Sequence, residues 1–313
     1  MEMVERLITR ARYRTGNKNY TYAPATGLYT EGLSTETFIE ALNDAQDHLQ
    51  SKLITYNTNL FLQAEEKPLV QGTQDYALTK RVFGATGIRA VFYNPNNNST
   101  DYDAKLRKGD PQDFRYYEGV PQYYIPYSEK IALVPVPSVS SGYVKIVFHE
   151  ELDDLQISRG KVTSGTGADI TLDASPAPDE YEFDNGIYVC ISDRFGDPVL
   201  RNGIISSYNS GTRVLTLAAN VSTYLVTGKV LTDINGCFVT VGKYTTTRSK
   251  LPDICERYLR TFAAKRAMQT DKDSTSTEED SEMVRMEEEI LEFYNDETPD
   301  VDEFPILDTE SML

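Results

Sequence analysis

The most regular pattern of hydrophobic and polar positions lies within residues 119–155. Residues 143–149 (YVKIVFH) place three apolar side chains on one face: Val144, Ile146 and Phe148. A period of two residues is typical of a half-buried strand. Two extended runs, 123–127 and 130–135, precede this strand, and turn-forming residues at 138–142 lead into it. The pattern predicts a small antiparallel β-meander, which we expect to organise the surrounding chain.

Helical periodicity lies on both sides of this stretch. We expect helices over 1–15, over 35–57 with Ser34 or Thr35 as the cap, from 250 onward, and over 282–294. The helix over 35–57 carries one apolar stripe: Phe38, Leu42, Ala45, Leu49 and Leu53. The helix that begins near Pro252 is expected to pack against it, which would close the first domain around whatever lies between them.

Shorter elements connect the second helix to the meander. Apolar runs predict strands at 60–64 and 68–78 around a polar turn, and another at 88–93. The charged stretch 103–115 predicts a short helix and a turn. Together with the meander, these elements favour an α+β helix–sheet module.

The composition changes over residues 158–249, where Gly, Thr, Ser and Val dominate. Short apolar runs separated by turn residues predict a small all-β barrel or sandwich. The expected strands are Lys161–Ser164, Ile170–Leu172, Gly186–Asp193, Ile204–Tyr208, Arg213–Ala218, Lys229–Asp233 and Phe238–Tyr244. We therefore expect a module formed by 1–157 and 250–294, an inserted β-domain at 158–249 and an extended acidic arm at 295–313.

Charge is unevenly distributed along the chain. The net charge is −17, and residues 271–313 contain 17 acidic residues against only Lys272 and Arg285. The N-terminal helix is basic and aligns Arg6, Arg10 and Arg14 in a row. Such asymmetry favours contacts with differently charged surfaces, although solvated ends are the alternative.

The acidic arm also contains apolar residues, among them Phe304, Ile306, Leu307 and Met312. Acids alternating with apolar anchors favour docking on a partner over a free terminus.

The search for catalytic and ligand-binding motifs predicts no enzyme, cofactor or metal site. The 160–167 glycines lack a phosphate-binding sequence, and His48 and His149 lack metal-ligand spacing. The acids at 150–154 are read as a strand end rather than a carboxylate pair, and acids at 179–180, 193 and 197 give only a weak calcium alternative. No apolar run approaches the roughly 20 residues of a membrane span, and the charged N-terminus does not resemble a signal peptide.

Three cysteines, Cys190, Cys237 and Cys255, are predicted to be reduced thiols that are partly buried. A Cys190–Cys237 disulfide is the alternative.

Tyrosine is abundant, with 21 residues in the chain, and several precede the meander. Tyr123 and Tyr124 are candidates for an interface or for the core, and composition weighs the two equally. The sheet region has no Arg/Lys stripe of the kind that binds nucleic acid.

The order of four short patterns resembles the head-to-tail connector adaptor proteins of tailed bacteriophages. These patterns are an Asn43-x-Ala45-Gln46 helix core, a GTQDYALT segment at 72–79, the stretch 119–148, and the helix at 251–268. The resemblance covers about 1–157 and 250–294, and the block 158–249 departs from it.

The resemblance implies a structural virion protein that forms a ring, of twelve copies in that family, beneath the portal at the head–tail interface. It implies assembly in the host cytoplasm and contacts with the portal protein, with other copies of the chain and with tail, nozzle, fibre or collar proteins. DNA would pass only as non-specific cargo. We assign Arg6, Arg10, Arg14, Phe304, Ile306, Leu307 and Met312 to the portal or neighbour interface, and Tyr123 and Tyr124 to a tail or ring contact.

Two alternatives stay open. The chain fits a lower tail ring or nozzle component, and it also fits a glycan-binding or hydrolytic virion protein whose 158–249 block holds the glycan.

Overall fold

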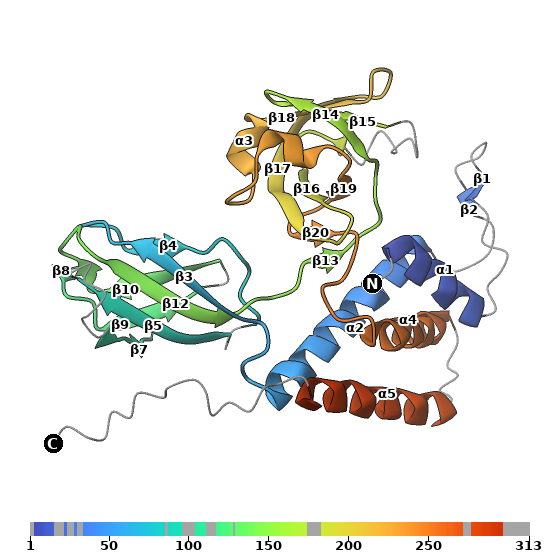
Figure 1. Cartoon of the computed structure of the whole chain (residues 1–313), viewed down its shortest axis with the longest axis horizontal. Helices are drawn as coiled ribbons and strands as arrows, with labels where there is room; N and C mark the ends of the chain where they lie inside the picture. The colour runs from blue at the N-terminus through green and yellow to red at the C-terminus, as the bar shows by residue number, and fades with distance from the viewer. Residues whose placement is uncertain are drawn as a thin grey trace. The chain divides into compact units, whose positions relative to one another are not determined.

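The chain folds as a mixed α+β protein with two compact units in a computed structural model (Figure 1). One unit comprises Met1–Gln50 and Asp153–Leu313, and the other comprises Ser51–Leu152. The structure describes residues 3–15, 22–23, 28–29, 34–84, 87–95, 104–110, 117–127, 129–173, 183–271 and 277–296. Each unit is described separately below.

The first unit contains four long helices drawn from both ends of the chain. They are α1 (Val4–Arg14), α2 (Thr35–Tyr56), α4 (Cys255–Asp271) and α5 (Thr277–Asp296), and the last turns of α2, from Ser51 on, belong to the second unit. Helix α4 packs against both α1 and α5. A two-stranded pair, β1 (Tyr22–Ala23) with β2 (Leu28–Tyr29), lies between α1 and α2 in the sequence.

The apolar stripes predicted for these helices are buried. All five stripe residues of α2 have no exposed surface, and α1 buries Val4, Leu7, Ile8 and Ala11. Ser34 caps α2 through its Oγ, which accepts a hydrogen bond of 3.1 Å from the Thr37 amide. Side chains of α2 also reach α4, where His48 stacks on Tyr258. The expected packing of these two helices is confirmed.

The 158–249 block forms a curled, antiparallel half-barrel of six strands. In spatial order, these are β14 (Val162–Thr166), β15 (Asp169–Leu172), β18 (Val214–Leu217), β17 (Pro198–Asn209), β16 (Tyr188–Ser192) and β19 (Phe238–Val241). Alternate apolar residues of these strands, together with Phe183 and Ile234, form its core. A short helix, α3 (Val221–Tyr224), lies against β17.

One predicted strand of this block is wrong. Residues 229–233 do not join the sheet, and a 3-10 helix covers Leu231–Ile234. Ile234 is fully buried, and its side chain would meet a Cβ at position 165 within 2.3 Å, so glycine at 165 makes room for it. The 3-10 helix therefore places Ile234 in the core of the half-barrel and does not add a strand to its sheet.

The two ends of the half-barrel block lie side by side. Strand β13 (Asp154–Leu155) leads into the block, strand β20 (Thr245–Thr246) leads out of it, and the two pair in parallel. The block thus leaves and rejoins the rest of the unit at one place.

The second unit contains two four-stranded sheets. The first has the order β4 (Asp75–Ala77), β10 (Lys130–Val134), β9 (Tyr123–Pro126), β7 (Arg107–Lys108). The second has the order β3 (Leu62–Pro68), β12 (Tyr143–His149), β5 (Ile88–Asn94), β6 (Ala104–Lys105). A parallel pair, β8 (Glu118–Gly119) with β11 (Val136–Pro137), completes it. Residues from both sheets share one hydrophobic cluster, with Val91, Ile131 and Val144 fully buried.

The predicted β-meander is wrong in its third strand. Strands β9 and β10 pair as expected, but β12 pairs with β3 and β5 in the other sheet. Residues 135–142 carry the chain from one sheet to the other, which the local pattern does not reveal. The alternation within β12 is confirmed, because Val144, Ile146 and Phe148 are fully buried.

Two further local predictions are corrected. The polar residues 65–67 lie inside β3 rather than in a turn, because β3 is an edge strand where Glu66 is exposed and Glu65 accepts a hydrogen bond from the Thr79 amide. Residues 104–108 form strands β6 and β7 instead of the predicted helix. Buried Leu106 lies between them and donates its amide to Val91, so tertiary pairing overrides the local charge pattern.

Candidate interaction surfaces

The second unit exposes a group of large side chains around β8 and β9, which we call the tyrosine edge. Its members are Tyr117 (54% exposed), Val120 (61%), Tyr123 (39%) and Tyr127 (41%). Exposed tyrosines grouped in this way are typical of protein interfaces, because the ring contributes apolar area and the hydroxyl tolerates water.

Tyr123 and Tyr124 have opposite environments, since successive residues of a strand point to opposite faces. Tyr123 belongs to the tyrosine edge, whereas Tyr124 is only 6% exposed and packs in the core beside Leu133. Burial also raises the pKa of the Tyr124 hydroxyl. Of the two residues assigned to a tail or ring contact, Tyr123 is therefore the one that a partner of the folded unit can reach.

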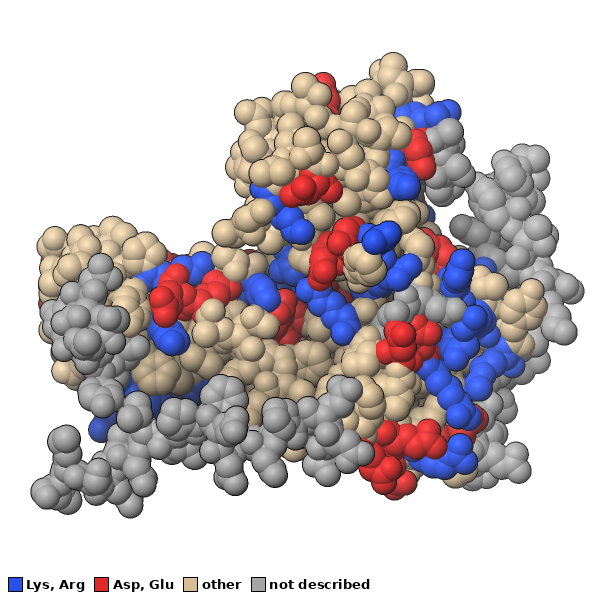
Figure 2. Space-filling model, in the orientation of Figure 1, with Lys and Arg blue, Asp and Glu red and all other residues tan. Residues whose placement is uncertain are grey.

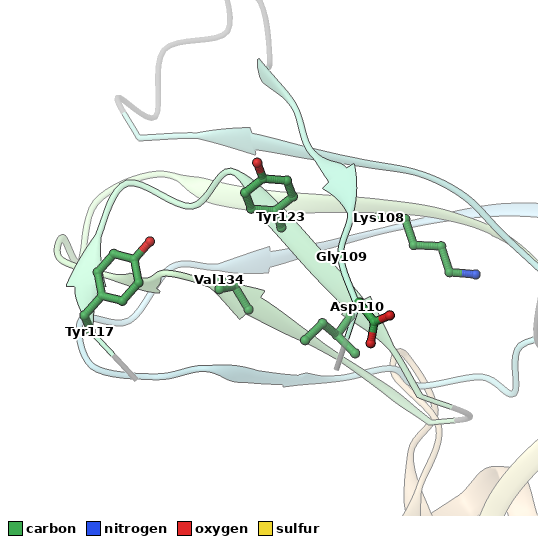
Figure 3. Close-up of a pocket in the computed structure, with 7 residues that line it drawn as sticks. Lys108, Gly109, Asp110, Tyr117, Tyr123 and Val134 are labelled. Atoms are coloured by element: carbon green, nitrogen blue, oxygen red, sulfur yellow. The ribbon is translucent and has the colours of Figure 1, made fainter. Parts of the chain in front are cut away.

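A cavity of about 480 Å³ lies next to the tyrosine edge (Figure 3). Its lining consists of Lys108, Gly109, Asp110, Tyr117, Tyr123, Ile125 and Val134. Backbone hydrogen bonds position these residues. The Gly109 amide donates to Tyr124 at 2.9 Å, and the Val136 amide donates to Tyr117 at 3.0 Å. A Cβ on residue 109 would lie 3.3 Å from the Tyr123 Cβ, so glycine lets this backbone pass close to β9.

Three basic residues accompany this cavity. Lys105, Arg107 and Lys108 are exposed on β6 and β7, and Arg107 lies opposite Tyr123 in the parallel pairing of β7 with β9. Within the described part of the chain, none of the three forms an ion pair. The sequence prediction missed this group because it placed residues 103–115 in a helix and a turn.

The row predicted on α1 is only partly exposed. Arg6 and Arg10 are exposed. Arg14, in contrast, donates to the Thr261 hydroxyl of α4 and lies 3.8 Å from Glu282 of α5. Arg14 therefore joins three helices of its own unit. Figure 2 shows basic and acidic side chains lying next to one another over these helices.

A polar cluster, buried at Tyr258 and Glu287 and exposed at His48, links α2, α4 and α5. The Tyr258 hydroxyl donates to Glu287 Oε1 at 3.0 Å, and His48 Nε2 lies 3.4 Å from the same oxygen. Burial, with Glu287 adding to it, raises the pKa of Tyr258, so its hydroxyl stays a donor. Sequence reasoning read His48 as a structural or exposed residue rather than a metal ligand, and it did not identify the partners of His48, because Glu287 lies far away in the sequence.

The acids that close residues 119–155 also have structural partners. Lys80 Nζ lies 2.6 Å from Glu150 Oε2 in the second unit. In the first unit, Arg201 of β17 lies 2.8 Å from Asp153 Oδ2, and both side chains are nearly buried. Asn43 of α2 binds the Leu155 backbone in both directions. The Asp153 and Asn43 contacts anchor β13 in the first unit, whereas the Glu150 contact lies within the second unit.

The calcium alternative receives a simpler explanation at Asp193. Its Oδ1 accepts hydrogen bonds from the Phe195 amide at 2.8 Å and from the Asp197 amide at 3.0 Å, which closes a turn. Among the described residues, no group of three or more His, Cys, Asp or Glu side chains is placed to hold a metal. Residues 179–180 lie outside the described part.

All three cysteines are free and buried, so the alternative Cys190–Cys237 disulfide is not formed. Burial raises the pKa of Cys255 to about 12 and also raises the pKa of Cys237, so both remain protonated thiols near neutral pH.

The four arm residues assigned to the portal or neighbour interface, Phe304, Ile306, Leu307 and Met312, lie outside the described residues. Their sequence-based assignment stays a prediction.

Comparisons with known proteins add no relative. No protein-family model matches this chain, and no curated protein matches it either. In the described part of the chain, every helix is too short or too polar to cross a membrane.

Proposed function

We propose that this chain is a structural subunit of the ring that joins the portal to the tail of a tailed bacteriophage. One observation carries the proposal: each compact unit exposes a surface of a different chemical kind. The second unit exposes the tyrosine edge and the three basic residues of the adjoining strands. The first exposes Arg6 and Arg10 on α1 and three acids on α5, which are Glu288, Glu289 and Glu292.

A ring is built from head-to-tail contacts, in which one patch on each subunit binds a different patch on the next. Complementary charge then guides the encounter and sets which patches pair. The basic α1 and the acidic residues of 271–313 provide opposite charges on one chain. This arrangement supports a ring subunit better than a symmetric dimer, which would use one self-complementary patch.

The half-barrel supports the same proposal. Because β13 and β20 pair at its base, the block departs from the helices at a single place and leaves them continuous. In the proposed ring, the half-barrel lies on the outside and contacts tail, fibre or collar proteins. The proposal includes DNA only as non-specific cargo and assigns no catalytic step to the chain.

The test is to mix the purified full-length chain with rings of the portal protein from the same virus and to average the complexes by cryo-electron microscopy. We expect a ring of this chain, of about twelve copies in the family it resembles, bound to the portal. A chain that stays monomeric and leaves the portal bare would contradict the proposal.

Two charge reversals sharpen this test. Arg6→Glu removes an exposed base from α1 and is expected to weaken portal or neighbour binding roughly five-fold, because an attractive contact becomes repulsive. Lys229→Glu makes the same change at an exposed site near the half-barrel and should bind like the wild type. Equal binding by both variants would remove α1 from the interface.

A polar cavity favours the glycan-binding alternative. About 380 Å³ of space in the half-barrel is lined by an aromatic pair and by small polar residues: Phe183, Asp184, Asn185, Ser206, Ser207, Tyr208 and Ser210. Hydroxyl, amide and carboxylate groups beside an aromatic ring suit a sugar. Glycan binding by the purified chain that Tyr208→Ala abolishes would favour this function over the ring.

A further inference from the structure

The cavity beside the tyrosine edge is lined by buried aliphatic side chains and by exposed tyrosine rings. Ile125 and Val134 are 2% and 7% exposed, whereas Tyr117 and Tyr123 stand open to solvent (Figure 3). Its volume of about 480 Å³ lies within the roughly 300–1,000 Å³ of protein sites that enclose a ligand. A cavity built in this way can bury more than one apolar side chain of a partner.

The basic side chains around the cavity favour a partner with negative charge. Lys108 lines the cavity itself, and Lys105 and Arg107 are exposed on the adjoining strands. Because none of the three forms an ion pair within the described residues, their charge is available to a partner. Asp110 also lines the cavity, so the local charge is positive but mixed.

The chain itself contains a segment with the complementary composition. Residues 297–313 (ETPDVDEFPILDTESML) hold six acids and no base, and the acids flank one apolar run at 304–307. This run is short enough to enter a single cavity, and Asp302, Glu303 and Asp308 would lie on either side of it. An apolar anchor in a desolvated pocket, surrounded by charged pairs, is the usual arrangement of an interface hot spot.

We propose that the cavity lined by Tyr117, Tyr123 and Lys108 binds residues 302–308 of a neighbouring copy of the chain. Phe304, with Ile306 or Leu307, enters the cavity, and the flanking acids face Lys105, Arg107 and Lys108. The choice of a neighbouring copy rests on the proposed ring, in which a segment of one subunit and a cavity of the next are two different patches of one head-to-tail contact.

The test places a photoreactive benzoylphenylalanine at position 304 of the full-length chain. Chains grown in ordinary and in nitrogen-15 medium are mixed, irradiated, digested and analysed by mass spectrometry. We expect crosslinks between heavy and light chains that map to peptides within 105–127. Their yield should fall as salt is raised, because salt screens the flanking charges.

Charge reversal provides the matched control. Lys108→Glu should lower the crosslink yield about five-fold, and Lys229→Glu, an exposed lysine of the other unit, should leave it unchanged. Equal yields for the two variants would overturn the inference. Crosslinks that form only within one chain, or that map elsewhere on the chain, would overturn it as well.

Portal binding by the same samples separates this inference from the proposed function. If portal-bound rings form but position 304 crosslinks outside 105–127, the inference fails and the function stands. If heavy and light chains crosslink at 105–127 but the chain leaves the portal bare, the inference stands and the function fails.

Discussion

His149 shows at the scale of a single residue how burial changes chemistry. Its ring is 2% exposed, and Nδ1 donates to the Leu60 carbonyl at 3.0 Å. Nε2 is buried with no hydrogen-bond partner in the described residues. Burial lowers the pKa of His149; the Leu60 hydrogen bond opposes this effect, and the nearby Arg89 reinforces it. The neutral ring is therefore the form that the folded second unit accepts.

This lowered pKa predicts a loss of stability in mild acid. The unfolded chain binds the proton at about pH 6.5, so the stabilising effect of the neutral ring is complete above that pH. It is lost as the pH falls below 6.5 towards the folded pKa. His149→Asn keeps a donor near Leu60 but does not titrate, so its free energy of unfolding should fall less between pH 7.5 and pH 5.

Urea unfolding of both proteins at several pH values measures the difference. The two proteins differ only at position 149, so the difference between their pH profiles belongs to that residue. Parallel pH profiles for the two proteins would show that His149 does not carry this dependence.

At the scale of elements, β12 is the strand on which the second unit depends, since it pairs with both β3 and β5. Its start is set by Gly142, whose φ of +87° is one that side chains rarely adopt. The Gly142 carbonyl accepts the Leu69 amide at 3.1 Å. A Cβ at this position would lie 1.9 Å from the Asn94 carbonyl oxygen, so the turn can approach β5 only with glycine.

Gly142→Ala is accordingly expected to destabilise the second unit by about 3 kcal/mol, from the strained dihedral and the backbone clash together. Gly72→Ala is the matched control, because Gly72 also has a positive φ, +74°, but a Cβ there meets no atom within 4 Å. It should cost only about 1 kcal/mol. Urea unfolding of the full-length variants compares the two, and equal losses would exclude the clash as a cause.

The elements also show where local sequence patterns succeed. The long helices and the alternation of β12 were predictable, because neighbours within four residues carry the signal. His149 departs from that alternation: the polar face of β12 would leave it exposed. The pairing with β5 shifts by one residue between Val147 and Phe148, and such an irregularity depends on the partner strand rather than on β12.

At the scale of the whole molecule, the half-barrel is held to its unit by a buried ion pair. Asp153, just before β13, and Arg201, in β17, lie 2.8 Å apart with side chains 4% and 11% exposed. The Arg201 guanidinium also lies 5.7 Å from the Tyr244 ring centre. Two segments that are distant in the sequence thus meet at the base of the inserted block.

Asp153→Asn removes the carboxylate charge that lies 2.8 Å from the nearly buried Arg201 guanidinium, so we expect a loss of about 3 kcal/mol in the free energy of unfolding. Asp197→Asn removes an exposed acid that lies 3.7 Å from Lys250, and it should cost less than about 1 kcal/mol. Thermal or urea unfolding of both variants measures the difference. A small loss for Asp153→Asn would mean that the ion pair does not anchor the half-barrel.

The sequence by itself determined the long helices, the β-rich nature of residues 158–249 and the separation of charge along the chain, because each depends on composition or on neighbours a few residues apart. Only the tertiary structure decided that β12 leaves the sheet of β9 and β10, that Tyr123 faces solvent while Tyr124 faces the core, and that Lys108 lies beside an aromatic cavity. The physical reason is the distance along the sequence over which the deciding contacts act. Strand partners and burial are set by contacts between segments tens of residues apart, and a local period records that a strand has two faces but not which face the rest of the chain covers.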